Sequence, residues 1–426
     1  MTKAMVIGGG IIGLASAFFL RKKGMEVVLI DKGEPGAECS SGNMGWVCPS
    51  LSDPVPAPGL VKTSLKWMLK RDSPLYIKPS IVPSLSPWLL QFWKFCSEDA
   101  YQKGYKAGLE LSRNTLRLFD ELEQESGLEF ESHRKGLLFV FLKESYIEEK
   151  LDAYRIVEEF GLPAPAAKSK NEVLQMEPAL SDAVAGGIYL SAERHVRPES
   201  LTGALTDWLV ANGTEILSRT EVKGLIREGD QIVGASIGEK TIEGDHFLVT
   251  AGAWTGQILN QAGIPIPMTA GKGYSLTISS PSIQFQQPLY LGDSRVTISP
   301  FDHSVRIGGT MELSGLNSDL DQRRIDSLRS SAAQYLRSPI HGKERAWCGM
   351  RPMTPDGLPV MGIVPSFSNL FIASGHAMSG ISMALSTGSV MSDLIASGKS
   401  DINLSPFAPD RFKTQRSSNK VSKVTV

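Results

Sequence analysis

Short apolar runs alternate with longer stretches of small and apolar residues at the start of the chain. Residues 3–7 form an apolar run of strand length, residues 14–23 have the composition and spacing of a helix, and residues 26–30 form a second apolar run. Runs of four to eight apolar residues are typical of buried strands, whereas a helix needs about ten residues or more. The pattern therefore predicts a strand, a helix and a second strand that ends at Asp31.

The same order of elements returns near the other end of the chain. An apolar run at 370–374 is followed by a Gly375-His376 turn and then by a helical pattern over 380–397. The stretch between the two ends is mixed. It predicts helices over 100–126, 144–160, 198–212 and the later part of 314–336, strands over 137–142, 186–190, 215–217, 222–225, 231–237 and 246–250, and a hairpin-rich region over 296–309.

Residues 53–93 break this regular pattern because they are rich in proline and in aromatic side chains. Prolines at this frequency prevent one regular element from spanning the segment. The sequence leaves three interpretations open: a packed core helix, an active-site lid, and a patch that faces a membrane.

The composition is that of an ordinary globular protein. The 426 residues, 42% of them hydrophobic and 21% charged, suffice for two or three domains. A net charge of -1 provides no field that would attract nucleic acid, which is therefore not an expected partner. Residues 411–426 are an exception, since they contain lysines and arginines but no acid. They predict a flexible basic tail, with contact to an anionic membrane surface as the alternative.

The cysteines and the first residues bear on the compartment. Four cysteines without a C-x-x-C pair favour a reducing environment, and the six histidines show no metal-ligand spacing. The first strand begins at residue 3, which leaves no room for a signal peptide, and no apolar run reaches the roughly 18 residues of a spanning helix. We expect a cytoplasmic protein without a metal, and peripheral contact with the inner face of the cell membrane stays open.

The glycines between the first strand and the first helix form the strongest motif. Gly8-Gly9-Gly10-Ile11-Ile12-Gly13 fits G-x-G-x-x-G. Gly8 permits a tight turn, Gly10 lets a pyrophosphate approach the helix N-terminus, and Gly13 lets the helix pack closely on the strand. Asp31 can accept hydrogen bonds from a ribose 2′-OH. The motif predicts a dinucleotide site, although it does not separate FAD from NAD.

Later motifs, taken in order, resemble those of a known family. They are Ser40-Ser41-Gly42-Asn43-Met44-Gly45, Val249 to Thr255, Gly271-Lys272-Gly273-Tyr274-Ser275, Arg306 to Leu313, Gly349 to Pro359 and the Gly375-His376 turn. Together with the N-terminal glycines they resemble the D-amino-acid oxidase superfamily of FAD enzymes, most closely the bacterial D-amino-acid dehydrogenase small-subunit type. The resemblance extends from residue 4 to about residue 398.

The resemblance and the pattern together imply an α/β plus α+β fold. Because nucleotide-type βα units stand at both ends of the chain, we expect a discontinuous Rossmann-like FAD-binding domain with an inserted mixed-sheet substrate domain. We assign residues 1–80, 190–262 and 345–410 to the FAD-binding domain, and 81–189 and 263–344 to the substrate or cap domain.

The resemblance also implies which residues bind FAD, without a covalent bond. A second helix, which begins after Gly375, would direct its N-terminus at the pyrimidine edge of the flavin. For His376 a direct flavin contact competes with capping or packing, and Val222 is an adenine contact or a plain strand residue. The residues expected at the cofactor are Gly8, Gly10, Ile12, Gly13, Asp31, Lys32, Ser40, Ser41, Met44, Gly45, Trp46, Val222, Ala251, Gly252, Trp254, Gly375, His376, Gly380 and Ile381.

For the substrate, the resemblance places Arg351 in the carboxylate site, where a planar guanidinium donates two parallel hydrogen bonds. Tyr274 is either a second donor to that carboxylate or a buried core tyrosine. The implied reaction is the oxidation of a D-amino acid to a 2-oxo acid and ammonia, with electrons passed to a quinone or another acceptor. Three alternatives stay open: an oxidase of glycine, sarcosine or hydroxyproline that uses O2, a flavin subunit of a heteromeric complex, and an NAD(P) dehydrogenase. The oligomeric state also stays open.

Three features are interpreted as coincidental. Residues 234–238 fit the G-x-S-x-G of serine hydrolases, but Glu239-Lys240 predicts a hairpin turn where that motif needs a helix. Gly398-Lys399-Ser400 matches the end of a P-loop motif, but position 393, where the motif needs its first glycine, is Asp. Cys348 lies where some relatives attach flavin covalently, yet its surroundings are of the non-covalent type, and a small buried thiol is the simpler interpretation.

Overall fold

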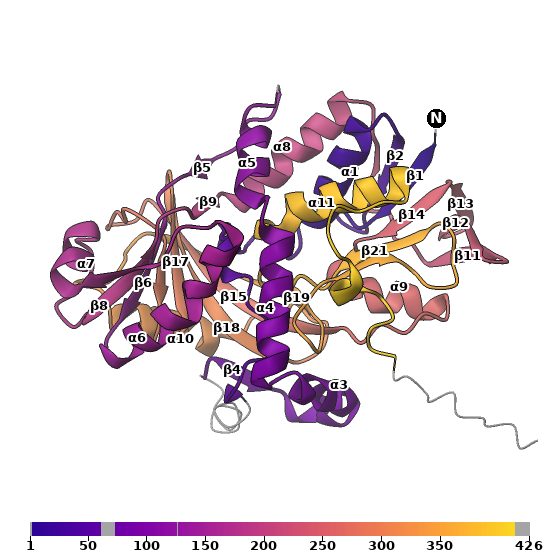
Figure 1. Cartoon of the computed structure of the whole chain (residues 1–426). Helices are drawn as coiled ribbons and strands as arrows, with labels where there is room; N and C mark the ends of the chain where they lie inside the picture. Colours follow the sequence, from indigo (N-terminus) through magenta and orange to yellow (C-terminus); the bar gives the residue numbers. More distant parts are fainter. Residues whose placement is uncertain (1, 61–72, 126, 414–426) are drawn as a thin grey trace, which may run out of the picture.

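The computed structural model describes residues 2–60, 73–125 and 127–413, which fold around two large sheets that lie side by side (Figure 1). The first sheet has the strand order β10–β2–β1–β14–β21–β20, and its neighbours run parallel except for β20 beside β21. Its strands are β1 (Lys3–Ile7), β2 (Glu26–Ile30), β10 (Glu215–Leu217), β14 (His246–Val249), β20 (Val360–Ile363) and β21 (Leu370–Ser374). Widely separated parts of the chain therefore build this sheet.

Both faces of the first sheet are covered. Ala4 and Val6 of β1 pack against the helices α1 (Ile11–Lys22), α8 (Pro198–Ala211) and α11 (Gly380–Ser397). Met5 and Ile7 point to the opposite face, which is covered by a small antiparallel sheet and a helix. These are β11 (Gly224–Glu228), β12 (Gln231–Ile237), β13 (Lys240–Glu243) and α9 (Thr255–Gln261). Burial on both sides explains why the strands are apolar throughout.

The second sheet is mixed and has nine strands. Its order is β19–β15–β18–β17–β16–β6–β8–β7, and β4 pairs with β18. Among the described residues, the parallel pairs of this sheet are β16–β6 and β18–β4, and its other pairs are antiparallel. The strands are β4 (Leu75–Ile77), β6 (Leu137–Phe141), β7 (Ala166–Ser169), β8 (Gly186–Leu190), β15 (Thr269–Ser279), β16 (Leu289–Leu291), β17 (Val296–Phe301), β18 (Ser304–Leu313) and β19 (Lys343–Met353). Helix α10 (Gln322–Ala333) packs on one face of this sheet through Ile325 and Leu328.

The two sheets confirm the predicted fold class, a discontinuous Rossmann-like domain with an inserted mixed-sheet domain. The exact domain segments stay predictions. The predicted boundary at residue 345 falls inside β19, which pairs along its whole length with β15. Likewise β4 precedes the predicted boundary at residue 80 but pairs with β18 of the second sheet. Hydrogen bonding therefore favours the assignment of both strands to the inserted domain.

Several elements differ from the prediction in their ends. Helix α1 begins at Ile11, three positions before residue 14, because the extended Gly10 (ψ 177°) forms its N-cap directly after the glycine turn. The helix predicted over 100–126 is two helices, α4 (Glu98–Ser112) and α5 (Thr115–Glu123), and residue 126 lies outside the described residues. The helix predicted over 144–160 is α6 (Ser145–Tyr154) followed by a 3-10 turn.

The proline-rich segment contains β4 and helix α3 (Val82–Lys94), while its residues 61–72 lie outside the described residues. Helix α3 buries only Leu85 and Trp88, so it is a core helix along one side alone. The predicted basic tail is also mostly outside the described residues. Its first residue, Arg411, pairs with the buried Asp356 at 2.7 Å and is part of the folded structure.

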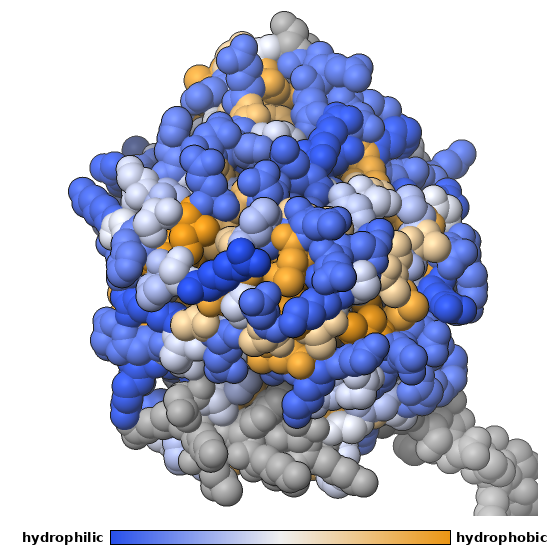
Figure 2. Space-filling view, turned by 90° about the vertical axis from the view of Figure 1, so that its left-hand side faces the viewer, coloured by the Kyte–Doolittle hydropathy of each residue, from blue (hydrophilic) through white to orange (hydrophobic). Residues whose placement is uncertain are grey.

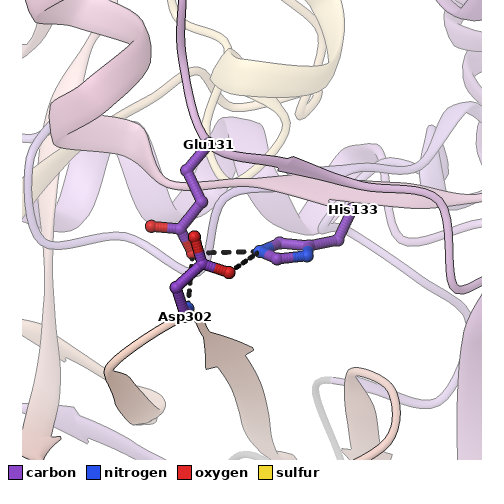
Figure 3. A group of neighbouring side chains, drawn as sticks. All are labelled: Glu131, His133 and Asp302. Atoms are coloured by element: carbon purple, nitrogen blue, oxygen red, sulfur yellow. Dashed lines mark hydrogen bonds and ion pairs between the residues drawn. The ribbon is translucent and has the colours of Figure 1, made fainter.

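A smaller sheet of β3 (Trp46–Val47), β9 (Arg194–Val196) and β5 (Ser132–His133) joins the two large ones, and α7 (Lys170–Met176) lies at the far edge. Beside β5, Glu131, His133 and Asp302 point toward one another (Figure 3). Glu131 Oε1 accepts hydrogen bonds from the His133 ring (3.0 Å) and from the Asp302 backbone N–H (2.8 Å), and Arg197 lies beside Oε2. We interpret this cluster as structural, since it holds the segment around β5 to the turn at Asp302.

The face that carries α6 and α7 is mainly hydrophilic, with apolar side chains gathered around its middle (Figure 2). Within the described ranges, no helix combines the length and apolar character that crossing a membrane requires.

Candidate active site

One large cavity lies between the two sheets. Its volume is about 1420 Å³, and it is lined from both sheets, from helix α3 and from the loop over residues 38–60. The carboxyl ends of β1, β2, β14 and β21 open into it through Gly8, Asp31, Thr250 and Gly375. In open parallel sheets this edge is where ligands bind.

The glycine turn brings backbone close to this cavity. Gly8 has φ +113°, and a Cβ atom there would lie 2.6 Å from the Thr250 carbonyl oxygen. A Cβ on Gly13 would lie 1.9 Å from the Gly8 carbonyl oxygen, so Gly13 permits the close packing of α1 as predicted, although it does not itself line the cavity. The Asp31 carboxylate accepts hydrogen bonds from the Gly9 and Gly33 N–H groups, at 2.6 and 2.7 Å.

Two long helices direct their N-termini into the same cavity. Gly10, Ile11 and Ile12 line it from α1, and Gly380 and Ile381 line it from α11. Neither helix has an acidic residue in its first turn, and neither N-cap residue makes a side-chain capping bond. Apart from the Ile11 N–H, which donates to the Ser40 hydroxyl, the partial positive charge of both ends is therefore available to a ligand.

His376 lies in the turn before α11 and is buried. Its Nε2 lies 3.0 Å from the Thr387 hydroxyl, and no partner reaches Nδ1 among the described residues. Burial lowers the pKa of His376 to about 3, so the ring is neutral at physiological pH. The contact with Thr387 supports the packing interpretation for this side chain, although the residue also lines the cavity.

The loop of residues 40–46 is held from two sides. The Ser40 hydroxyl accepts a hydrogen bond from the Ile11 N–H at 2.9 Å. The buried Arg306 donates to the carbonyl oxygens of Ser41 and Asn43 at 3.1 and 2.6 Å, and its charge is balanced by Glu199. The sequence shows Arg306 only as part of a motif. Its role in holding this loop could not be predicted, because the contact joins residues far apart in the chain.

Most residues predicted at the cofactor line the one cavity. The exceptions are Gly13 and Ser41, and the Ser41 hydroxyl donates to the Ala37 and Glu38 carbonyl oxygens. At one end, Lys32 Nζ lies 3.3 Å from the centroid of the Trp254 ring. The cavity-lining residues of the prediction are Gly8, Gly10, Ile12, Asp31, Lys32, Ser40, Met44, Gly45, Trp46, Val222, Ala251, Gly252, Trp254, Gly375, His376, Gly380 and Ile381.

Arg351 lines the cavity from β19. A Cβ atom on Gly273 of the neighbouring strand would lie 2.3 Å from the Arg351 guanidinium carbon, so the missing side chain makes room for this group. Its Nη1 donates to the Thr310 carbonyl oxygen at 2.8 Å, and no carboxylate in the described part of the chain forms an ion pair with it. Burial lowers the pKa of the guanidinium, which remains charged because its ordinary pKa exceeds 12.

Tyr274 departs from its predicted role. Its backbone belongs to a cavity-lining strand, but its buried hydroxyl donates to Glu312 Oε2 at 2.7 Å on the side covered by α10. Successive side chains of β15 alternate between the two faces of the sheet, and Tyr274 falls on the face opposite to Gly273. The hydroxyl is therefore not directed at a carboxylate beside Arg351, and the core-tyrosine interpretation is the one that fits.

The cavity also contains residues that sequence reasoning did not select. Cys39 lies close to Arg351, and burial raises the pKa of its thiol to about 11. Asp53, Tyr101 and Tyr290 line a further part. Their contributing segments are remote in sequence and match no motif, so no local signal could have selected them.

The features interpreted as coincidental do not enter the site. Gly234 to Gly238 lie in the β12–β13 hairpin, with no helix after them, as predicted. Cys348 does not line the cavity, and its thiol donates to the Ser318 carbonyl oxygen at 3.4 Å. The four cysteines, all within the described ranges, form no disulfide.

The geometry fits a bound FAD. The glycine turn at Gly8, the N-termini of α1 and α11 and the carboxylate of Asp31 all face one cavity. These groups are the donors and acceptors that a pyrophosphate, an isoalloxazine edge and a ribose require.

Comparison with known proteins agrees with an FAD-binding fold. Residues 3–394 match the family model DAO, described as FAD dependent oxidoreductase. Glycine oxidase from Geobacillus kaustophilus is similar in structure, with a TM-score of 0.77 at 22% identity over 96% of this chain and 99% of that one. L-proline dehydrogenase from P. horikoshii has a TM-score of 0.76 at 20% sequence identity, over 96% of this chain and 97% of that one. L-amino acid deaminase from Proteus myxofaciens, in complex with anthranilate, has a TM-score of 0.73 at 15% sequence identity, over 97% of this chain and 94% of that one.

Proposed function

The chain belongs to the DAO family of FAD-dependent oxidoreductases, and on this premise we propose that it oxidises amino acids at the α carbon, with D-amino acids as its substrates. The observation that carries the proposal is Arg351, a half-buried cation that faces the cavity without a carboxylate partner in the described structure. A substrate carboxylate would supply the missing charge. The similar structures named above act on glycine, L-proline and L-amino acids, which supports the substrate class and leaves the D preference to experiment.

The residues that would hold FAD follow from the cavity. The N–H groups at the start of α1 would bind the pyrophosphate, Asp31 the adenosine ribose, and the start of α11 the pyrimidine edge of the flavin. The loop of residues 40–46, held by Arg306, would lie along the ring system. When bound, FAD accepts the hydride from the substrate and passes the electrons on to an acceptor.

The protein's own part in the reaction is to bind and orient. The Arg351 guanidinium would donate two parallel hydrogen bonds to the substrate carboxylate, which fixes the α carbon and its hydrogen relative to the cofactor. The amino acid reacts as the neutral amine, and the imino acid that leaves is hydrolysed to a 2-oxo acid and ammonia. His376 is neutral and directed at Thr387, so we assign it no role as a general base.

For the acceptor we propose a quinone, reached at the inner face of the cell membrane. Leu90, Trp93 and Met378 line the cavity and are nevertheless 59%, 62% and 61% exposed. An apolar rim of this kind favours an apolar acceptor over a charged one.

Anaerobic reduction of the purified holoenzyme tests the proposal. D-alanine, D-proline, L-proline, glycine and sarcosine are added in turn while the flavin absorbance is recorded. We expect D-amino acids to bleach the flavin and the colour to return slowly in air. Fast return in air would replace the quinone by O2, and bleaching by glycine or sarcosine alone would replace the D-amino acid. Bleaching by none of the five would exclude small neutral amino acids, and bleaching by none of a wider set that includes basic and acidic amino acids would overturn the amino-acid assignment.

A further inference from the structure

The cavity extends beyond Trp46 into a compartment formed by α4, α6, β6 and β16, which we call the tyrosine compartment. Its walls are Asp53, Tyr101, Phe139, Tyr154 and Tyr290, and all five line the same cavity as Arg351. Trp46 of the predicted flavin loop joins the two parts, because its ring centroid lies 6.3 Å from that of Tyr290.

Aromatic rings enclose this compartment. The Phe139 ring lies 4.8 Å from Tyr290 and 5.6 Å from Tyr154, measured between ring centroids. Electron-rich faces of this kind attract cations. One cation already lies at the outer side, since Lys150 Nζ is 5.7 Å from the centre of the Tyr154 ring.

The polar groups of the compartment are only partly satisfied. Asp53 accepts a hydrogen bond from the Tyr101 hydroxyl at 3.3 Å, and no ion pair to it is formed in the described part of the chain. The hydroxyls of Tyr154 and Tyr290 have no hydrogen-bond partner among the described residues. Burial raises the pKa of Asp53, while the charge of Lys150, which lies beyond ion-pair distance, lowers it. The Asp53 charge in turn helps to raise the pKa of Tyr101, Tyr154 and Tyr290, all of which line the same cavity.

A carboxyl group and three hydroxyls surrounded by aromatic faces match one kind of ligand. We propose that the tyrosine compartment binds the positively charged end of a substrate side chain, which makes basic amino acids the preferred substrates. A cation supplies the ion pair that Asp53 lacks, donates to the free hydroxyls and stacks against the rings. The proposal rests on the proposed function, since Arg351 binds the carboxylate of the same substrate.

Two exposed cations also line the cavity and could favour the opposite side-chain charge. Lys150 and Arg295 are both exposed and line the cavity. If their charges dominated, acidic side chains would be preferred, so the experiment includes glutamate.

The test compares substrates that differ only in the terminal charge. Ornithine and norleucine have side chains of equal length, and the second replaces the ammonium by a methyl group. With holoenzyme, and with both enantiomers of each, we expect kcat/KM to be about 10-fold or more higher for ornithine than for norleucine, and lowest for glutamate. Preference for norleucine or glutamate would overturn the proposal.

Variants locate the effect. Asp53→Asn should lower the ratio of ornithine to norleucine by about 10-fold to 100-fold, and Tyr290→Phe by a few-fold, because each removes one partner of the ammonium. Asp152→Asn, on the exposed side of α6, is the matched control and should leave the ratio unchanged. An unchanged ratio in both Asp53→Asn and Tyr290→Phe would exclude the compartment as the cation site.

Equilibrium binding separates this proposal from the proposed function. α-Methylornithine and α-methylnorleucine have no hydrogen on the α carbon and are not oxidised. We expect the first to bind more tightly, as measured by the shift of flavin absorbance, and Asp53→Asn to remove the difference. Oxidation of alanine without any preference for cationic ligands would overturn the compartment alone, whereas preferential binding without oxidation of any amino acid would overturn the reaction alone.

Discussion

The two sides of the nine-stranded sheet differ in whether their charged side chains have partners of opposite charge. On the face under α10, Glu312 forms a 3.0 Å ion pair with Lys272, accepts a 2.7 Å hydrogen bond from Tyr274 and lies 3.7 Å from Arg324. On the cavity side, Arg351 has a backbone carbonyl as its partner, and Asp53, in the loop across the cavity, has the Tyr101 hydroxyl and the more distant charge of Lys150.

From this difference we infer which charges serve the structure and which are available to a ligand. Burial of a charge is costly, and a protein recovers the cost within itself by pairing the charge. On the face under α10 each of these charges has a partner of opposite sign, and a second, smaller cavity is lined by Lys272, Tyr274 and Glu312. The cavity side leaves a cation and an acid unpaired in the described structure, and a zwitterionic ligand with a second positive charge would complete both.

The largest effect is expected when the paired charges on the face under α10 lose a partner. Glu312→Gln leaves Lys272 and Arg324 buried without their carboxylate, which should lower the free energy of unfolding by about 3–5 kcal/mol. Thermal and urea unfolding measure the change. Asp326→Asn, which removes the exposed ion pair with Arg329, is the control and should change the stability by less than about 1 kcal/mol. Equal effects of the two variants would show that the buried network is not special.

The second effect concerns the cavity side. Arg351→Met should lower kcat/KM for amino acids by about 100-fold or more, mostly through KM, because it removes a bidentate charge-assisted contact. Stability should change little, since no ion pair with Arg351 exists in the described structure to be lost.

The matched variant is Arg351→Lys, which keeps the charge without the planar fork and should recover only part of the activity. Flavin content, read from the visible spectrum, should be unchanged in both variants. A large fall in melting temperature for Arg351→Met, comparable to that for Glu312→Gln, would contradict the distinction between the two faces.

The smallest effect concerns a buried acid that no ligand can reach. Glu193 lies behind the cavity wall, where its Oε1 accepts a hydrogen bond from the Ser50 N–H and its Oε2 has no partner in the described structure. Burial raises the pKa of Glu193 to about 7, so the folded protein keeps this group protonated while the unfolded chain ionises above about 4.5. Its contribution to stability is therefore full below pH 4.5 and is lost progressively as the pH rises to 7.

Urea unfolding between pH 4.5 and 7.5 measures this slope. Glu193→Gln should flatten the part of the slope that Glu193 causes. Glu177, whose pKa burial also raises to about 7, should retain its own part and serves as an internal control. A slope identical in the variant and the parent protein would show that Glu193 is ionised in the folded state.

The N-terminal half of the cofactor site was predictable because its recognition is local. Gly8, Gly10, Gly13 and Asp31 lie within one strand–turn–helix–strand unit, and their spacing in sequence fixes their spacing in space. Errors here were small. Helix α1 begins three residues before its predicted start, because Gly10 caps it directly after the turn.

The substrate side was predictable only in part. The position of Arg351 in its motif pointed to a carboxylate site, but nothing in the sequence told which face of β15 Tyr274 would occupy, and its hydroxyl is paired with Glu312. A register shift between β15 and β18 lies between Lys272 and Tyr274, and one such shift changes which side chains share a face.

The sequence by itself therefore determined the family, the cofactor and the order of the elements, because apolar periodicity and glycine spacing are properties of neighbouring residues. Only the tertiary structure decided which charges are paired. It brought Asp53 to Tyr290, Gly273 to Arg351 and Arg306 to the loop before Trp46. These contacts depend on strand register and sheet order, which arise from packing over the whole chain and leave no mark on the residues next to them.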